Sequence, residues 1–127
     1  MNFLSFFLFY ATIVTACINA TTVVVSQNPK SGQFSTIQAA VNSLSTVSTT
    51  DQTISVEAGT YVEQVKVPAR KAHLTIIGAV SGNRGTYLSN KVKLVYGASQ
   101  ADGLTNDETA TLRVYAEHFV MHNVDVS

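Results

Sequence analysis

An all-β fold with one short helix is predicted by the order of the hydrophobic patterns along the chain. Apolar side chains at helical spacing come early, at Ile37, Ala40, Val41 and Leu44. Short runs with the alternation typical of β-strands follow, at residues 53–56, 61–67, 74–77, 92–96, 109–115 and 119–126. No Asn-Gly or Asp-Gly pair joins two matched runs as a tight hairpin. The pattern therefore leaves two architectures open, a β-sandwich and a parallel solenoid of stacked coils.

The opening strand and the helix have well-marked ends. Residues 21–26 form a β-branched run, which is closed by the turn residues Gln27-Asn28-Pro29. Ser35 is the predicted N-cap of the helix, and Gln38 three residues later completes a capping box. Because so short a helix is marginal in water by itself, we expect its apolar stripe to cover one end of the sheet that follows.

Residues 1–20 predict a secretory signal peptide. The stretch 3–16 is almost unbroken Phe, Leu, Ile, Val and Ala, with small residues at Ala16 and Ala20. It is shorter than the ~20 residues that span a bilayer, so stable membrane insertion is not expected. An alternative is that Val14-Thr15-Ala16-Cys17 is a lipobox and Cys17 carries a lipid, which the Ile-Asn-Ala ending disfavours. We expect a secreted, extracellular protein whose folded part, residues 21–127, has no cysteine.

Charge and histidine spacing argue against several classes of partner. The chain has 8 basic and 8 acidic residues, a net charge of zero and no basic block, so nucleic acid is not an expected partner. His118 and His122 would share one face of a strand, as a metal pair requires, but no third ligand accompanies them. We therefore expect no metal and no other cofactor. The sequence carries no signal for oligomeric state.

The segment Gly59-Thr60-Tyr61-Val62-Glu63 is the most informative motif in the chain. Gly59 is expected to supply a turn conformation that a side chain would resist. Tyr61 is expected to pack inside the fold with its hydroxyl group satisfied. A carboxylate such as Glu63 could serve as a catalytic acid, but we expect it to be a structural hydrogen-bonding group near the turn. The motif is thus predicted to be structural.

This motif and its neighbours resemble the pectin methylesterase family. Successive blocks of that family are similar to residues 33–41 (QFSTIQAAV), 54–63 (ISVEAGTYVE), 74–78 (LTIIG), 109–114 (TATLRV) and 119–124 (FVMHNV), in the same order and at similar spacing. The sequences of these blocks most resemble those of secreted fungal members. The resemblance implies a right-handed parallel β-helix, here incomplete, with the short helix capping its amino-terminal end. It thereby decides between the solenoid and the sandwich.

The resemblance also implies a reaction, the hydrolysis of methyl esters of homogalacturonan (pectin) with release of methanol. In that family one aspartate is the nucleophile, a second is the acid/base, and glutamines stabilise the oxyanion. The blocks that carry these groups would begin shortly after Ser127, so no residue here is assigned a catalytic role. We expect an amino-terminal portion of a pectinesterase that is inactive alone. The alternatives are a non-catalytic pectin-binding coil and a structural β-helix of an exported protein.

Substrate contact is expected in the polar loop from Ser99 to Glu108, because long loops on solenoids often line the binding face. The resemblance places a substrate-binding threonine just before the strand that follows the loop. Asn106 stands at the matching position and Thr109 lies close by. These two residues are the predicted pectin-binding residues, with a solvated loop as the competing interpretation.

Overall fold

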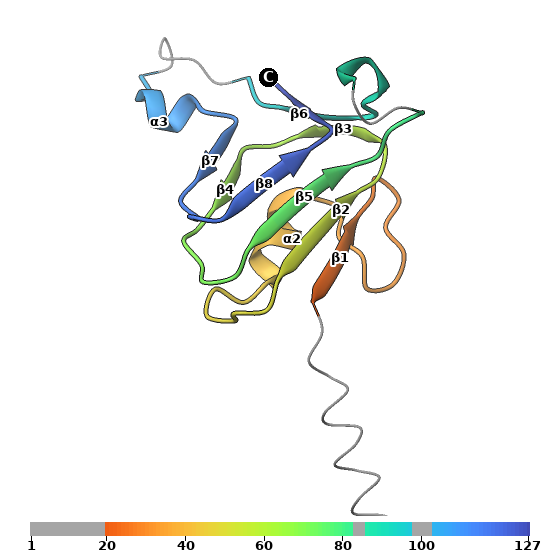
Figure 1. Ribbon diagram of the computed structural model, residues 1–127. Coiled ribbons are helices and arrows are strands. Elements are labelled where there is room, and N and C mark those ends of the chain that lie inside the picture. The colour runs from red at the N-terminus through yellow and green to blue at the C-terminus, as the bar shows by residue number, and fades with distance from the viewer. Residues whose placement is uncertain (1–19, 83–85, 98–102) are drawn as a thin grey trace, which may run out of the picture.

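Parallel strands arranged in three sheets form the framework of the described part of this chain. The structure is a computed structural model that describes residues 20–82, 86–97 and 103–127 (Figure 1). The first sheet has the order β1-β2-β5-β8, the second β3-β6-β9 and the third β4-β7, and every pair is parallel. The strands are β1 (Thr21–Val25), β2 (Gln52–Val56), β3 (Gly59–Val62), β4 (Val65–Val67), β5 (Leu74–Gly78), β6 (Val92–Val95), β7 (Leu112–Val114), β8 (Phe119–His122) and β9 (Val124–Val126).

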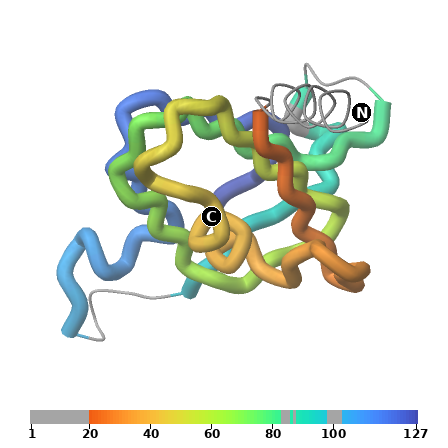
Figure 2. The backbone as a smooth tube through the Cα atoms, turned by 90° about the horizontal axis from the view of Figure 1, so that it is seen from below, coloured from red at the N-terminus to blue at the C-terminus, as the bar shows by residue number. Residues whose placement is uncertain are grey.

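The chain visits the three sheets in the same order on each turn. It runs from β2 to β3 to β4, returns to the first sheet as β5, and continues to β6 and β7 before β8 and β9 begin the next coil. Figure 2 shows these coils lying over one another around a shared interior. This path is that of a parallel β-helix and excludes the sandwich, whose strands would pair antiparallel.

Inward-facing side chains stack from coil to coil because the parallel register keeps like positions in line. Ile54 lies beside Ile76, and Ile76 beside Met121. In the second sheet Tyr61 lies beside Leu94. Ile54, Ile76 and Leu94 are fully buried. Burying one such aliphatic side chain contributes about 1.5–3 kcal/mol, so these stacks are the main source of stability.

The helix α2 (Ile37–Ser43) covers the end of the solenoid at the first coil, as expected. Its buried residues Ile37, Ala40 and Val41 join the core cluster, and the helix packs on β1, β2 and β4. The predicted N-cap Ser35 is wrong by one residue. Thr36 is the N-cap, since its hydroxyl group accepts from the Ala39 amide at 3.1 Å.

The predicted capping box at the start of α2 is also wrong. The Gln38 side chain reaches sideways to β4, where its Oε1 accepts from the Lys66 amide at 2.7 Å and its Nε2 donates to the Lys66 carbonyl at 3.1 Å. Hydrogen bonds between the helix and β4 therefore take the place of the capping box, while Thr36 remains the N-cap.

Three predicted strands are shorter than expected. The run 61–67 divides into β3 and β4 at Glu63-Gln64, where the chain turns from the second sheet to the third. The run 119–126 divides at Asn123, which has a left-handed φ of 58°. The run 109–115 contains only β7, because its first residue ends a short helix, α3 (Asn106–Thr109). The corner at Glu63-Gln64 keeps the alternation of inward residues, so periodicity alone does not reveal it.

A 3-10 turn, η1 (Tyr87–Ser89), precedes β6. No helix among the described residues is long and apolar enough to cross a membrane. The predicted signal peptide and Cys17 lie almost entirely outside the described residues, so the boundary at residue 20 stays a prediction.

Candidate functional site

The Gly59-Tyr61-Glu63 motif lies on β3 and on the corner that follows it, beside the start of the capping helix. The Glu63 carboxylate accepts from the Ile37 amide at 3.0 Å and from the Gln38 amide at 2.9 Å. Two amides of the first helical turn, which have no partner inside the helix, are satisfied in this way. Glu63 thus fastens the corner between β3 and β4 to the helix. Both of its carboxylate oxygens accept a hydrogen bond from the protein.

Tyr61 and Gly59, the other two motif residues, also have structural roles. Tyr61 is 3% exposed, and its hydroxyl group donates to the Glu57 carbonyl at 2.9 Å. Burial, followed by the charges of Glu57 and Glu63, raises the pKa of Tyr61 above its usual value. Gly59 has a φ of +155°, and a Cβ atom there would lie 2.5 Å from Cγ of Gln27. None of the three presents a group for chemistry at the surface.

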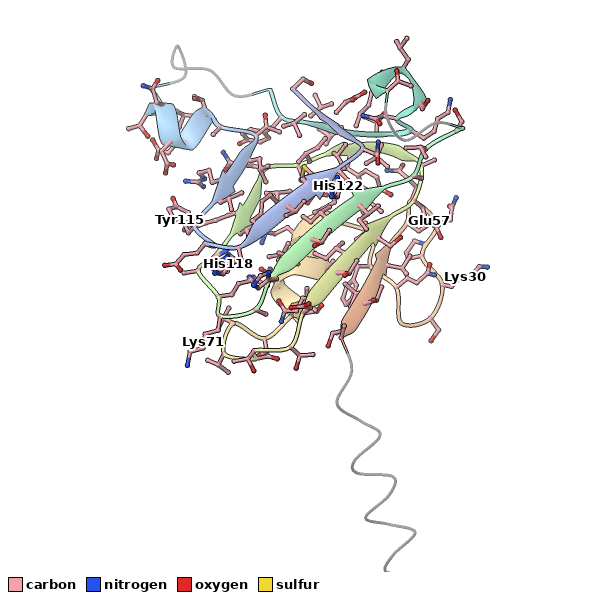
Figure 3. All side chains as sticks on the ribbon, viewed as in Figure 1. Lys30, Glu57, Lys71, Tyr115, His118 and His122 are labelled. Atoms are coloured by element: carbon pink, nitrogen blue, oxygen red, sulfur yellow. The ribbon has the colours of Figure 1, made fainter. Side chains whose placement is uncertain are left out.

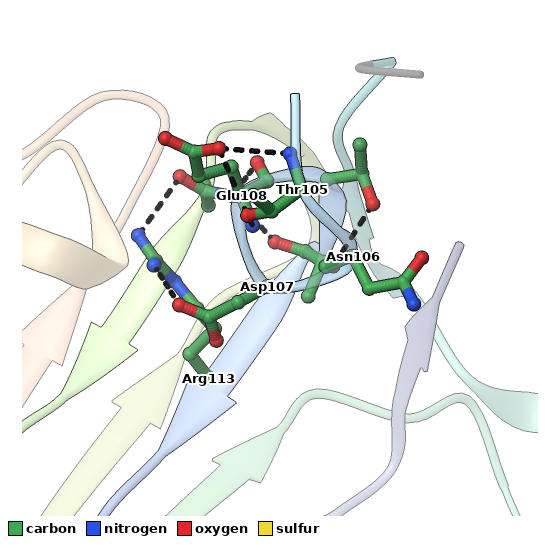
Figure 4. A network of polar contacts seen from close by, with 8 residues as sticks. Thr105, Asn106, Asp107, Glu108 and Arg113 are labelled. Atoms are coloured by element: carbon green, nitrogen blue, oxygen red, sulfur yellow. Dashed lines mark hydrogen bonds and ion pairs between the residues drawn. The ribbon is translucent and has the colours of Figure 1, made fainter. Parts of the chain in front are cut away.

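The two predicted pectin-binding residues are the first and last residues of α3. The Thr109 hydroxyl group donates to the Asn106 carbonyl at 2.9 Å, so the structure brings them together (Figure 4). Asn106 is exposed and Thr109 is partly buried. Part of the predicted substrate loop, residues 99–102, lies outside the described residues.

A capping box begins α3. The Thr105 hydroxyl group accepts from the Glu108 amide at 3.3 Å, while the Glu108 carboxylate accepts from the Thr105 amide at 2.8 Å. The Thr105 hydroxyl group also donates to the Glu108 carboxylate at 2.8 Å. The bonds that the carboxylate accepts, first that from the Thr105 amide and then that from the hydroxyl group, lower the pKa of Glu108 below its usual value. The Glu108 carboxylate is therefore held in its ionised form.

Arg113 on β7 ties α3 to the sheet. Its Nη1 donates to Asp107 Oδ2 at 2.7 Å, and its Nη2 donates to Gln64 Oε1 at 3.3 Å. Gln64 in turn donates to the Glu108 and Ala110 carbonyls, both at 2.7 Å. The hydrogen bond to Asp107 raises the pKa of Arg113 further. Both carboxylates of α3 are thus engaged in holding the helix, and neither is placed as a nucleophile.

The outer surface of the third sheet carries cationic and aromatic side chains. Lys66 on β4 lies beside Arg113 on β7 in the parallel register, and both point outward. Nζ of Lys66 lies 5.4 Å from the centre of the Tyr115 ring, within the range of a cation–π contact. We call the outward side chains of Lys66, Arg113 and Tyr115 the β4–β7 face.

Next to this face the β4–β5 turn, the β7–β8 turn and the loop after α2 line an open hollow of about 500 Å³. We call it the turn hollow. Tyr115 belongs to both features. Figure 3 shows Tyr115, His118 and Lys71 along the same edge of the molecule. The polar, charged and aromatic side chains that line the hollow are Thr46, Arg70, Lys71, Tyr115, Glu117 and His118.

Arg70 is the buried member of this lining, with 8% of its surface exposed. Its Nη1 donates to Gln52 Oε1 at 2.9 Å, and its Nε lies 3.4 Å from the Pro68 carbonyl. Its Nη2 has no hydrogen-bond partner among the described residues. Burial lowers the pKa of Arg70, although a guanidinium group stays protonated at neutral pH.

The two histidines considered as a metal pair are separated by the structure. His118 stacks on His73 of the preceding coil, with ring centres 4.4 Å apart and planes 12° from parallel. His122 lies at the other end of β8, beside Ile77. The described residues contain no group of three His, Cys, Asp or Glu side chains that could hold a metal ion.

Sequence reasoning missed Lys66 and Arg113 as members of one surface, and Arg70 as a buried cation beside the turn hollow. Arg113 and Lys66 each stand at the polar position of an alternating run, Val-Lys-Val and Leu-Arg-Val. That signal marks them as outward-facing, but it does not show that the two runs are neighbours. The turn hollow had no sequence signal at all, because its lining comes from three separate turns.

The three parallel sheets define this chain as a parallel β-helix protein. The chain belongs to the pectinesterase family, since the family model Pectinesterase matches residues 22–127. Both the predicted fold class and the predicted family are confirmed.

Curated relatives and solved structures agree with this assignment. A pectinesterase of Aspergillus niger is 44% identical over 96 residues, which cover 76% of this chain and 29% of the relative. A pectinesterase of Aspergillus aculeatus is 37% identical over 97 residues. The crystal structure of the pectin methylesterase from Aspergillus niger in deglycosylated form superposes with a TM-score of 0.70 at 31% identity, covering 81% of this chain and 32% of that one. The chain thus spans about 29% of the length of these curated relatives.

Proposed function

We propose that this chain serves in the hydrolysis of methyl esters of homogalacturonan, the reaction that releases methanol from pectin. The observation that carries the proposal is the pectinesterase family match over residues 22–127. The 44% identity to a fungal pectinesterase and the shared fold support it. The binding partner is pectin, a polymer of uronic acids. Residues 1–20 serve as the signal peptide that directs export from the cell.

The role of these residues in the reaction is structural and substrate-binding. Ester hydrolysis by carboxylates needs one group as nucleophile and a second as general acid, both open to the substrate. Asp107 forms an ion pair with Arg113, Glu108 closes a capping box and Glu63 holds α2. None of these three carboxylates is therefore available as nucleophile or general acid.

The β4–β7 face is the surface that contacts pectin in this proposal. Lys66 provides positive charge for the carboxylates of the polymer, and Tyr115 offers a ring on which a sugar can lie. Arg113 lies beside Lys66 and is paired with Asp107. α3, with Asn106 and Thr109, stands beside that face through the bonds of Gln64 and Arg113. The two predicted residues remain candidates for hydrogen bonds to sugar hydroxyl groups.

Methanol release tests the proposal. The secreted protein made from the natural gene is purified and incubated with methyl-esterified pectin, in parallel with the 127-residue chain at the same molar concentration. Methanol from the natural gene product and none from the 127-residue chain is the expected result. A natural gene product that binds no pectin and releases no methanol would refute the proposal.

A second candidate is a pectin-binding protein without catalysis. It is favoured by the same observation that excludes a nucleophile here, namely that the carboxylates around α3 are all engaged in structural bonds. Binding of pectin with no methanol release by the natural gene product would select this candidate.

A further inference from the structure

We propose that the turn hollow is a binding site for a free uronate carboxylate, distinct from the β4–β7 face and selective for de-esterified over methyl-esterified pectin. The inference rests on the proposed function for its choice of polymer. It goes beyond that function by assigning a second contact surface and a preference between the substrate and product forms of the sugar.

The hollow has the size and chemistry of a small-ligand site. Its volume of about 500 Å³ falls within the roughly 300–1,000 Å³ that is usual for such sites. Its lining combines one aromatic ring, Tyr115, with hydrogen-bonding groups from Thr46, Lys71 and Glu117. A sugar ring carries an apolar face of C–H groups and a rim of hydroxyl groups, and this lining matches both.

The charges in the hollow favour an anion. Arg70 and Lys71 face a single carboxylate, that of Glu117, and neither cation forms an ion pair in the described part of the chain. Arg70 is almost completely buried, with Nη2 lacking a protein acceptor. A buried cation without a counter-charge is costly, so a carboxylate bound in the hollow would relieve that cost.

The two cations would act at different ranges. Lys71 is an exposed residue in the lining of the hollow and is free to donate directly to a carboxylate oxygen. Nη2 of Arg70 is covered by protein atoms, so Arg70 would not touch the ligand. It would attract a carboxylate only through the electrostatic field of its positive charge. Charge-assisted hydrogen bonds are roughly twice as strong as neutral ones, which is why loss of the ligand's charge matters.

Tyr115 has the right position to hold the sugar ring. It follows β7 directly, its amide donates to the Val67 carbonyl at 2.8 Å, and Lys66 lies against its ring. Its side chain is nevertheless half exposed and lines the hollow. Because Tyr115 also belongs to the β4–β7 face, one pectin chain could cross that face and place a de-esterified sugar in the hollow.

A methyl ester would be rejected for a physical reason. Esterification removes the negative charge and replaces one carboxylate oxygen with an OCH₃ group, which accepts hydrogen bonds poorly. Lys71 and Arg70 would then gain no counter-charge from the ligand, although Tyr115 could still contact the ring. The hollow is therefore expected to distinguish the product of the reaction from its substrate.

Calorimetric binding of defined oligomers to the full chain tests this assignment. The probes are a fully de-esterified oligogalacturonate and the fully methyl-esterified oligomer of the same length. Lys71→Gln and Tyr115→Ala are the test variants. Lys93→Gln is the matched control, because Lys93 is an exposed lysine on β6 in another sheet and its loss changes the net charge equally. Circular dichroism checks that each variant is folded.

The expected result is tighter binding of the de-esterified oligomer, weakened about fivefold to tenfold by Lys71→Gln and unchanged by Lys93→Gln. Tyr115→Ala should weaken both oligomers. Equal binding of the two oligomers, or equal effects of the two lysine variants, would overturn the inference. In either of those cases methanol release by the natural gene product would still stand, so the failure of this inference is distinguishable from failure of the proposed function.

Discussion

Glu63 shows how one side chain can join two distant parts of a solenoid. It lies at the corner between β3 and β4, and it accepts hydrogen bonds from two amides of a helix that begins 26 residues earlier. One of those amides belongs to Ile37, which is fully buried. A buried amide without an acceptor costs about 1–3 kcal/mol, so this carboxylate matters for stability rather than for catalysis.

Replacing Glu63 by alanine should lower the free energy of unfolding by about 1–3 kcal/mol, because the amides of Ile37 and Gln38 lose their acceptor. Urea denaturation followed by circular dichroism measures the change. Glu57→Ala is the matched control, since Glu57 is an exposed glutamate one coil corner away, and its loss should change stability by less than about 0.5 kcal/mol. Similar losses in the two variants would show that Glu63 does not anchor the helix.

Gly78 is the position where a side chain would be least tolerated. A Cβ atom there would lie 2.2 Å from the Asn123 carbonyl oxygen, which is backbone and cannot rotate away. Gly78→Ala should therefore destabilise the chain by about 2–3 kcal/mol through forced separation of neighbouring coils. Gly97→Ala, at a glycine with open space around it, should be close to neutral in the same thermal unfolding experiment. A neutral Gly78→Ala variant would contradict the close approach of these coils.

At the scale of elements, the sequence predicted what lies within each sheet but not where the chain turns a corner. The helix, β1, β2, β5 and β6 were predicted to within a residue or two, since each contains an unbroken pattern of one period. The corner at Glu63-Gln64 interrupts no pattern, because Tyr61 and Val65 keep the same alternation across it. At Asn123 the inward positions shift by one residue, from Met121 to Val124, but no turn residue of the glycine or proline type marks the change. The helix α3 was missed because its four residues are polar and depend on Gln64 and Arg113, which are distant in the sequence.

Arg113 should control the order of α3. Arg113→Gln removes the ion pair to Asp107, so the amides around Glu108 and Ala110 should exchange hydrogen for deuterium faster. The rate of amide hydrogen exchange in the core strands β2 and β5 should be unchanged. Lys93→Gln serves as the control for loss of one cation. Unchanged exchange in α3 would mean that the capping box alone holds this helix.

The capping box of α3 should also respond to pH. Hydrogen bonds from Thr105 lower the pKa of Glu108 in the folded chain below the 4.5 of a free glutamate. A group with a lowered folded pKa contributes stability at pH above its unfolded pKa, and that contribution is lost as the pH falls through the folded pKa. We expect the Thr105 amide signal in NMR spectra to shift as Glu108 is protonated, at a pH below 4.5. Thr105→Ala should move this midpoint upward; a midpoint that stays in place would contradict the capping role.

At the scale of the whole molecule, parallel pairing brings surface residues together that the sequence keeps far apart. Lys66 and Arg113 become neighbours only when β4 and β7 pair, and the turn hollow exists only because three turns meet at one edge. Alternation alone fits a sandwich as well as a solenoid, so the architecture followed from family resemblance. A binding surface assembled by stacking could not be predicted before the stacking was known.

The most direct test of the central claim is to map where pectin contacts the chain. The uniformly ¹⁵N-labelled 127-residue chain is titrated with a partly methyl-esterified oligogalacturonide, and amide shifts are followed residue by residue. We expect the amide shift changes to be concentrated on Lys66, Arg113 and Tyr115 and at Lys71 in the turn hollow. The outer surface of β3 and β6 should change little. Shifts centred on β3 and β6, or no saturable shifts at all, would contradict this expectation.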